Sequence, residues 1–171
     1  MYTQSSELVA EGKVEIDFER LVEEYTQKIY RYCFSILRNA HEAEDATQDV
    51  FLKVMQYKNR KNIDNMSAWL YKIAYNHCIN RINRRKIIPF VRHVEKYDQR
   101  VQQEEKDEEL HYILAQLKPK ERALIVLRIV EDKDFNEIAS ILGVSIPTAR
   151  KRYERTKAKI QKLLEGDEND V

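Results

Sequence analysis

The segment from Asp134 to Ile160 constrains the fold more than any other, because it holds two amphipathic helical patterns separated by a tight turn. Gly143 can take the left-handed conformation that ends a helix, and Ser145 can cap the start of the next one. Pro147 falls in the first turn of that second helix, where a missing N–H costs little. The segment therefore predicts a helix-turn-helix. The apolar positions at helical spacing are Phe135, Ile138, Ala139 and Leu142 in the first helix and Ala149, Tyr153, Thr156 and Ile160 in the second.

The second of these helices carries a basic face opposite its apolar stripe. Between Ile146 and Lys162 the chain has seven Lys or Arg and one acid, Glu154, although its overall formal net charge is only +1. This concentration favours contact with phosphates, and the helix start at 146–148 can meet base edges. A surface helix with merely solvated charges is the alternative. The outward-facing residues are Thr148, Lys151, Arg152, Arg155 and Lys159.

The composition favours helices throughout the chain. The 171 residues include only three Gly and three Pro, 35% are charged, and strand-like alternation of Val, Ile and Thr is hard to find. This length allows one domain or two small ones. The sequence has no apolar run of about eighteen residues and no signal-peptide pattern at its start, so a cytoplasmic protein is expected.

The sequence contains no pattern typical of a metal site or of catalysis. Cys33 and Cys78 lie 45 positions apart, which indicates two buried reduced thiols rather than a zinc site. Neither a nucleophile with its base nor a Gly-rich phosphate loop is recognisable. We therefore expect no enzyme activity, no cofactor and no metal. The scattered histidines, none with a partner at ligand spacing, are His41, His77, His93 and His111.

Two helices are predicted before residue 58. Asp17 can cap the first, and Asn39 with Glu42 has the capping-box spacing that starts the second. Glu42 and Glu44 can equally be first-turn acids that only stabilise the helix dipole. The buried stripe of the second helix is expected to contain Ala43, Ala46, Val50, Val54 and Tyr57. Its outward side is expected to contain Glu42, Glu44, Asp45, Gln48, Asp49 and Leu52, of which the last four predict a partner surface.

A polar connection over 58–65 precedes a basic helix that begins near Met66. Residues 72–86 contain five Lys or Arg and no acid. Trp69, Tyr71 and Tyr75 interleave with these basic groups and with amides, a mixture that can hold unstacked bases and their backbone. Tyr71 and Tyr75 can equally be core residues.

The character of the chain changes after Lys86. Pro89 breaks the helix, and residues 95–109 contain seven acids against three basic residues, which predicts a flexible acidic linker. A short amphipathic helix is expected from near Glu108, and Pro119 can open the next one. Asp134 and Glu137 then repeat the capping-box spacing at the entrance to the helix-turn-helix.

Three motifs together resemble bacterial sigma factors of the extracytoplasmic-function (ECF) group in the sigma-70 family. They are AEDATQDVFLKV (43–54), SAWLYKIAYNHCINRINRRK (67–86) and the C-terminal segment from LKPKERALIVLRIVEDKDF to ERTKAKI (117–160). The resemblance covers almost the whole chain and implies an all-α fold of two small helical domains, a sigma-two-like bundle and a sigma-four-like helix-turn-helix domain. The expected division is a disordered lead-in over 1–14, the first domain over 15–88, the linker over 89–106, the second domain over 107–164 and an acidic tail over 165–171.

The resemblance also implies a function, in which the protein binds core RNA polymerase and directs it to promoters for transcription initiation. The implied contacts to the clamp helices of the largest polymerase subunit are Asp45, Gln48, Asp49 and Leu52. The implied residues for melting and capturing the minus-ten element are Lys58, Asn59, Arg60, Lys61, Asn62, Trp69, Asn76, Asn80, Arg84 and Arg85. The implied minus-thirty-five residues in the helix-turn-helix are Ile146, Pro147, Thr148, Arg150, Lys151, Arg152 and Arg155.

The implied partners are core RNA polymerase, at its clamp helices and flap, and promoter DNA, without direct membrane insertion. Family members are commonly held inactive by an anti-sigma factor, often membrane-bound, so such a partner is expected too. Two positions depart from the family pattern: Asn80 stands where an Asp is common, and residues 131–135 lack a frequent Gly. The competing interpretation is a stand-alone helix-turn-helix transcriptional regulator with an N-terminal sensing or dimerising module.

Overall fold

A computed structural model describes residues 17–57, 63–87 and 108–167, and in these ranges every regular element is a helix. The predicted all-α fold is therefore confirmed. The expected lead-in, the linker over 89–106 and the last four residues of the tail lie outside the described residues. The elements are α1 (Phe18–Leu37), α2 (Ala40–Gln56), α3 (Met66–Ile87), α5 (Glu108–Gln116), α6 (Pro119–Ile125), the π-helix η2 (Val126–Val130), α7 (Phe135–Leu142) and α8 (Ile146–Asp167).

Short-range signals start and end these helices where the sequence predicts. The Asp17 carboxylate caps α1 by accepting backbone N–H bonds from the first turn, and the Asn39 side chain caps α2. Asp134 and Glu137 form the reciprocal capping box of α7. Gly143 ends α7 with φ 64°, in the left-handed region that suits glycine.

The N-terminal domain is a bundle of α1, α2 and α3 with an aromatic core. Tyr32 and Tyr71 meet edge to face with 5.1 Å between their ring centroids, and Tyr71 and Tyr75 are only 1% and 6% exposed. Both tyrosines thus belong to the core and cannot stack on bases. Cys33 and Cys78 are buried free thiols, as predicted.

The predicted burial of Tyr57 is wrong, since its side chain is 43% exposed. The reason is that α2 ends at Gln56, and Tyr57 takes an extended conformation as the C-cap, which removes it from the buried stripe. Phe51, which the sequence did not indicate, is buried beside Val50 and Val54.

The C-terminal domain contains α5 to α8 and has a π-turn that the sequence did not predict. The backbone N–H of Glu131 bonds to the carbonyl of Val126, so the helix that begins at Pro119 widens before it stops. Asp132 then turns the chain with φ 49°. An Asp in the left-handed region thus makes this turn, where residues 131–135 contain no Gly.

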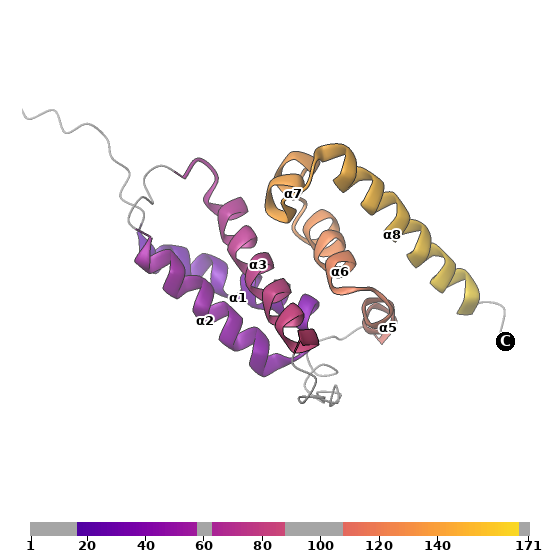
Figure 1. Ribbon diagram of the computed structural model, residues 1–171, viewed down its shortest axis with the longest axis horizontal. Coiled ribbons are helices and arrows are strands. Elements are labelled where there is room, and N and C mark those ends of the chain that lie inside the picture. The colour runs from indigo at the N-terminus through magenta and orange to yellow at the C-terminus, as the bar shows by residue number, and fades with distance from the viewer. Residues whose placement is uncertain (1–16, 58–62, 88–107, 168–171) are drawn as a thin grey trace, which may run out of the picture.

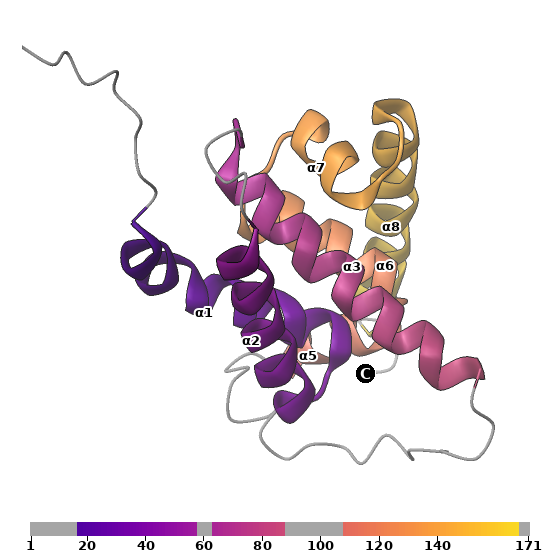
Figure 2. The same ribbon diagram turned by 60° about the vertical axis from the view of Figure 1, so that its left-hand side comes forward.

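The two domains pack on each other, which the prediction of a flexible linker did not anticipate. Figures 1 and 2 show α3 between the other helices of its own domain and α6 and α7 of the second. The end of α1 also contacts α6. Buried side chains of both domains form one continuous cluster.

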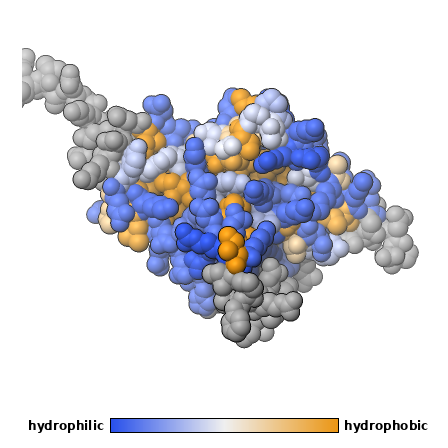
Figure 3. Space-filling view, viewed as in Figure 1, coloured by the Kyte–Doolittle hydropathy of each residue, from blue (hydrophilic) through white to orange (hydrophobic). Residues whose placement is uncertain are grey.

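Hydrophilic side chains cover most of the face seen in Figure 3, and the hydrophobic patches on it are small and separate. None of the described helices is long and apolar enough to cross a membrane.

The left-handed Asp132 gives a prediction about stability. Asp132→Gly should raise the free energy of unfolding by up to about 1 kcal/mol, because Gly accepts a positive φ without steric cost. The melting temperature should then rise by about 2–4 °C in a domain of this size. Asp132→Ala, which keeps the Cβ but loses the local polar group, should lower it. A lower melting temperature for Asp132→Gly, measured by thermal unfolding followed by circular dichroism, would contradict the left-handed conformation of residue 132.

Candidate functional site

The helix-turn-helix is built by α7, a short turn and α8. The Ser145 hydroxyl accepts the backbone N–H of Thr148 at 3.3 Å and lies 2.7 Å from the Thr148 hydroxyl, which caps α8 as predicted. The rings of Phe135 and Tyr153 meet at 5.6 Å between centroids and join the two helices. The start of α8 is therefore held rigidly against α7.

The predicted DNA-reading residues of α8 differ in their exposure. Thr148 and Arg152 are half-buried, and the Arg150 guanidinium lies over the Phe135 ring at 4.8 Å from its centroid. The exposed members of the set are Ile146, Pro147, Arg150, Lys151 and Arg155.

Lys159, expected on the outward basic face, instead pairs with Glu121 of α6 at 3.0 Å. Partial burial acts to raise the pKa of Glu121, but hydrogen bonds from the backbone of Lys118 and from Lys159 lower it overall. Lys159 thus fastens α8 to α6 and is engaged within the chain instead of on the expected outward face.

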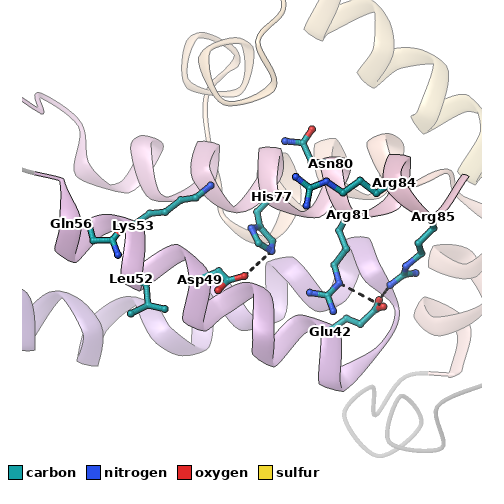
Figure 4. Close-up of a pocket in the computed structure, with 10 residues that line it drawn as sticks. All are labelled: Glu42, Asp49, Leu52, Lys53, Gln56, His77, Asn80, Arg81, Arg84 and Arg85. Carbon is teal, nitrogen blue, oxygen red and sulfur yellow. Dashed lines mark ion pairs between the residues drawn. The ribbon is translucent and has the colours of Figure 1, made fainter. Parts of the chain in front are cut away.

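A second candidate site is a groove of about 770 Å³ between α2 and α3. We call it the mixed-charge groove, because acids from α2 and bases from α3 face each other across it (Figure 4). Its lining residues are Glu42, Asp49, Leu52, Lys53, Gln56, His77, Asn80, Arg81, Arg84 and Arg85.

Glu42 is the centre of the charge pairs in this groove. Its carboxylate pairs with Arg85 and lies 3.7 Å from Nε of Arg81, whose Nη2 also approaches Asp45 at 3.4 Å. The Glu42 side chain is only 16% exposed. The predictions that Glu42 faces outward and that it serves only the helix dipole are therefore incomplete, because its ion pairs hold α2 against α3.

Asp49 and His77 form the other contact across the groove, with 3.3 Å between Oδ2 and Nε2. Burial lowers the pKa of His77, and the nearby Asp49 carboxylate only partly opposes this shift. The lowered pKa favours the neutral imidazole, whose Nε2 lies beside the Asp49 carboxylate. The Asp49 side chain is still 49% exposed.

The structure brings together only part of the predicted minus-ten set. Asn80, Arg84 and Arg85 line the mixed-charge groove, and Asn76 is exposed on α3. Trp69 is half-buried, with its ring centroid 5.0 Å from that of Tyr57. The remaining members, Lys58, Asn59, Arg60, Lys61 and Asn62, lie outside the described residues.

The predicted polymerase-contact residues occupy exposed positions along α2. Asp45 and Leu52 are 61% and 48% exposed, and Gln48 is exposed as well. Sequence reasoning missed His77 and Arg81, which meet these acids from α3. Their only signal is the spacing of His77, Arg81 and Arg85 by four residues, which places them on one side of a helix.

Comparison with known proteins identifies both halves of the chain. Residues 21–87 match the family model described as Sigma-70 region 2, and residues 107–160 match Sigma-70, region 4. Both regions of a sigma factor are thus present in one chain, in that order.

Individual proteins agree with these matches. The RNA polymerase sigma factor CarQ of Myxococcus xanthus is 30% identical over 160 residues, which cover 86% of this chain and 88% of CarQ. The ECF RNA polymerase sigma factor SigW of Bacillus subtilis is 29% identical over 167 residues, with coverage of 86% and 88%. The ECF sigma factor SigE of Mycolicibacterium smegmatis is 27% identical, and the match spans 61% of its length.

Two solved structures share the fold. The sigma factor RpoE in complex with the anti-sigma factor NepR, from Bartonella quintana, has a TM-score of 0.67 at 20% identity and covers 87% of this chain and 97% of RpoE. CnrH in complex with the cytosolic domain of CnrY has a TM-score of 0.64 at 22% identity, with 88% of each chain covered.

The chain belongs to the sigma-70 family of RNA polymerase sigma factors, in its extracytoplasmic-function group. Its function is therefore that of a promoter-directing factor for transcription initiation. A stand-alone helix-turn-helix regulator is not favoured, because region 2 accompanies region 4.

The Glu42 brace gives a second prediction. Glu42→Gln should lower the free energy of unfolding by about 1–2 kcal/mol, because a half-buried carboxylate loses its charge between two arginines that remain partly hydrated. Glu44→Gln, two residues further along the same helix and with a side chain that is 51% exposed, is the matched control. It should change the free energy of unfolding by less than about 0.5 kcal/mol. Urea unfolding measures both, and equal effects would contradict the special role of Glu42.

Proposed function

We propose that the two domains divide the work of promoter recognition, the first binding core polymerase and the minus-ten element and the second reading the minus-thirty-five element. The observation that carries this proposal is that one chain combines a helix-turn-helix, whose α8 presents exposed Lys and Arg side chains, with an acidic α2 and a basic α3. Neither domain alone offers both a polymerase surface and a duplex-reading helix.

The polymerase surface that we propose is the exposed side of α2. Asp45, Gln48 and Asp49 offer carboxylates and an amide, and Leu52 adds an exposed apolar contact beside them. Such a surface is complementary to a basic partner helix with an apolar patch, and its charges would steer the encounter. The clamp helices of the largest polymerase subunit are the partner that we propose.

The minus-ten grip that we propose runs along the exposed side of α3. Asn76 and Asn80 can hydrogen-bond to base edges, and Arg84 with Arg85 can hold the backbone of an opened strand. Residues 58–62, which precede α3, would supply further contacts to an unstacked base. Asn80 removes one negative charge from this path relative to the usual Asp, which favours contact with phosphates.

The minus-thirty-five grip that we propose is the start of α8. Ile146, Pro147 and Thr148 stand at the helix N-terminus, where a recognition helix meets base edges in the major groove. Lys151, Arg152 and Arg155 follow at helical spacing and can contact bases or phosphates.

The proposed partners are core RNA polymerase, including its flap, promoter DNA and an anti-sigma factor. The likeness of the fold to the sigma factor RpoE, solved in complex with the anti-sigma factor NepR, supports the last of these. Such a factor performs no catalysis of its own and needs no cofactor. Because its partners are polymerase and DNA, it would act in the bacterial cytoplasm.

Transcription with purified components tests this function. The chain with core RNA polymerase should initiate at specific promoters in a run-off assay, whereas the chain alone should bind duplex DNA weakly. Core polymerase without the chain is the control. Tight sequence-specific binding by the free chain, together with no initiation in the presence of core, would contradict the proposal.

Single substitutions test the division of labour. Asp49→Ala should weaken binding to core polymerase at every promoter, because it removes an exposed charge from the proposed docking surface. Arg152→Ala should leave core binding unchanged and weaken use of promoters that depend on the minus-thirty-five element, by about 1–3 kcal/mol if Arg152 reads a base. Lys157→Ala is the matched control, because Lys157 is an exposed basic residue on another side of α8. If Asp49→Ala changed only promoter choice, the proposed assignment of the domains would be wrong.

A further inference from the structure

One side chain in the mixed-charge groove can change its charge near neutral pH. His77 extends from α3 toward α2 (Figure 4), and its Nε2 lies 3.3 Å from Oδ2 of Asp49. The other ionisable groups that line the groove are carboxylates, one lysine and arginines, and such groups ordinarily keep their charge between about pH 5 and 8. Histidine is the side chain that ordinarily titrates within this range. The charge across the contact of α2 with α3 therefore depends on pH through His77.

The charged groups around His77 come from both helices. Asp49 and Lys53 face it from α2, and Arg81 and Arg84 lie near it on α3. The His77 side chain is 19% exposed, and its burial is the main cause of its lowered pKa. The three bases act in the same direction, and Asp49 acts against them. The neutral imidazole is thus favoured at neutral pH, and protonation begins in more acidic solution.

The two carboxylates of the proposed docking surface differ in the charge of their neighbours on α3. Asp45 lies 3.4 Å from Nη2 of Arg81, and an arginine is always charged. The group beside Asp49 is instead the His77 imidazole. While this ring is neutral, it does not cancel the charge of the half-exposed Asp49 carboxylate. Asp49 is therefore the docking carboxylate whose surroundings change most with pH.

Protonation of His77 changes what Asp49 offers to a basic partner. The imidazolium puts a positive charge 3.3 Å from the carboxylate and converts the contact into an ion pair. This pair carries no net charge, so the docking surface then attracts a basic helix less strongly. Complementary charge contributes to the association of proteins, and its loss weakens binding.

We propose that His77 is a positioning residue for polymerase docking and makes docking sensitive to pH, because its protonation places a cation against the Asp49 carboxylate. The inference rests on the proposed role of Asp49 in contacting core polymerase. While His77 is neutral, Asp49 is available to the clamp helices. Once His77 is protonated, α3 of the same chain engages the carboxylate, and loading of the chain on core polymerase falls.

Nuclear magnetic resonance of the free chain tests the contact itself. The pKa of His77, followed through its ring protons, should be lower in Asp49→Asn than in the native chain, because the carboxylate acts to raise it. Glu44→Gln is the matched control, since it removes a carboxylate of α2 that lies beside His41 instead. This control should leave the titration of His77 unchanged. An unchanged titration in Asp49→Asn would overturn the proposal.

Binding of core polymerase at two pH values tests the consequence. His77→Gln replaces the imidazole with a polar group that stays uncharged. From about pH 7.5 to 5.5, the affinity of the native chain should fall about threefold more than that of His77→Gln, because docking to a basic partner makes protonation of His77 less favourable. Measuring both chains with the same polymerase removes the titration of the polymerase from the comparison. Equal falls in affinity would overturn the proposal.

Two further variants locate the effect. His41→Gln alters an exposed histidine of the same domain, beside Glu44, and should keep the native pH dependence. In an Asp49→Asn background, His77→Gln should no longer change the pH dependence, because the charge on which His77 acts is gone. A His77-dependent fall that persisted in this background would overturn the proposal. Should His77→Gln fail to fold, the resonance titration still decides, because it leaves His77 in place.

These outcomes are separate from failure of the proposed function. If Asp49→Ala weakened core binding while the native and His77→Gln chains had the same pH dependence, the docking role would stand and only the pH sensitivity would fall. If Asp49→Ala left core binding unchanged, the docking role of Asp49 would fall, and the inference that rests on it would fall too.

Discussion

The arrangement of this molecule depends on a buried positive charge, the guanidinium of Arg122. It donates to the carbonyl oxygens of Leu114 and Leu117, which end α5 and lead into α6, and to that of Ile36 near the end of α1. A buried charge is costly unless its hydrogen bonds are made, and here they come from backbone atoms of both domains. The favourable end of the α1 dipole adds to them. The same side chain therefore stabilises both the connection between α5 and α6 and the packing of the two domains.

In the mixed-charge groove, one set of ion pairs likewise joins two proposed binding surfaces. The acids of α2 that we propose for polymerase docking and the bases of α3 that we propose for DNA lie within ion-pair distance of one another, through Glu42, Asp45 and Arg81. Each set lowers the electrostatic cost of concentrating the other. A partner that binds one set would therefore change the charge that the other set presents.

Local features of this chain could be predicted from the sequence, and spatial ones could not. Asp17, Asn39, Asp134 and Gly143 act through bonds to neighbours a few residues away, so their patterns fix where helices begin and end. The pairing of Glu42 with Arg81 and Arg85 depends on the register of α2 against α3. The bond from the Lys133 ammonium to the Ser67 hydroxyl, at 2.8 Å, depends on how the two domains meet. No periodicity encodes either. The π-turn escaped prediction because apolar residues continue through it.

The π-turn at Val126–Val130 also determines the direction in which the chain leaves α6. A π-turn holds one residue more than an α-turn over the same bond, so it works as an inserted residue absorbed inside a helix. Removing one residue there would restore regular winding and rotate everything that follows by about 100° about the helix axis. The helix-turn-helix would survive such a deletion intact, yet Lys133 would point away from Ser67. A change in chain length far from the DNA-reading helix would therefore alter how the second domain packs against the first.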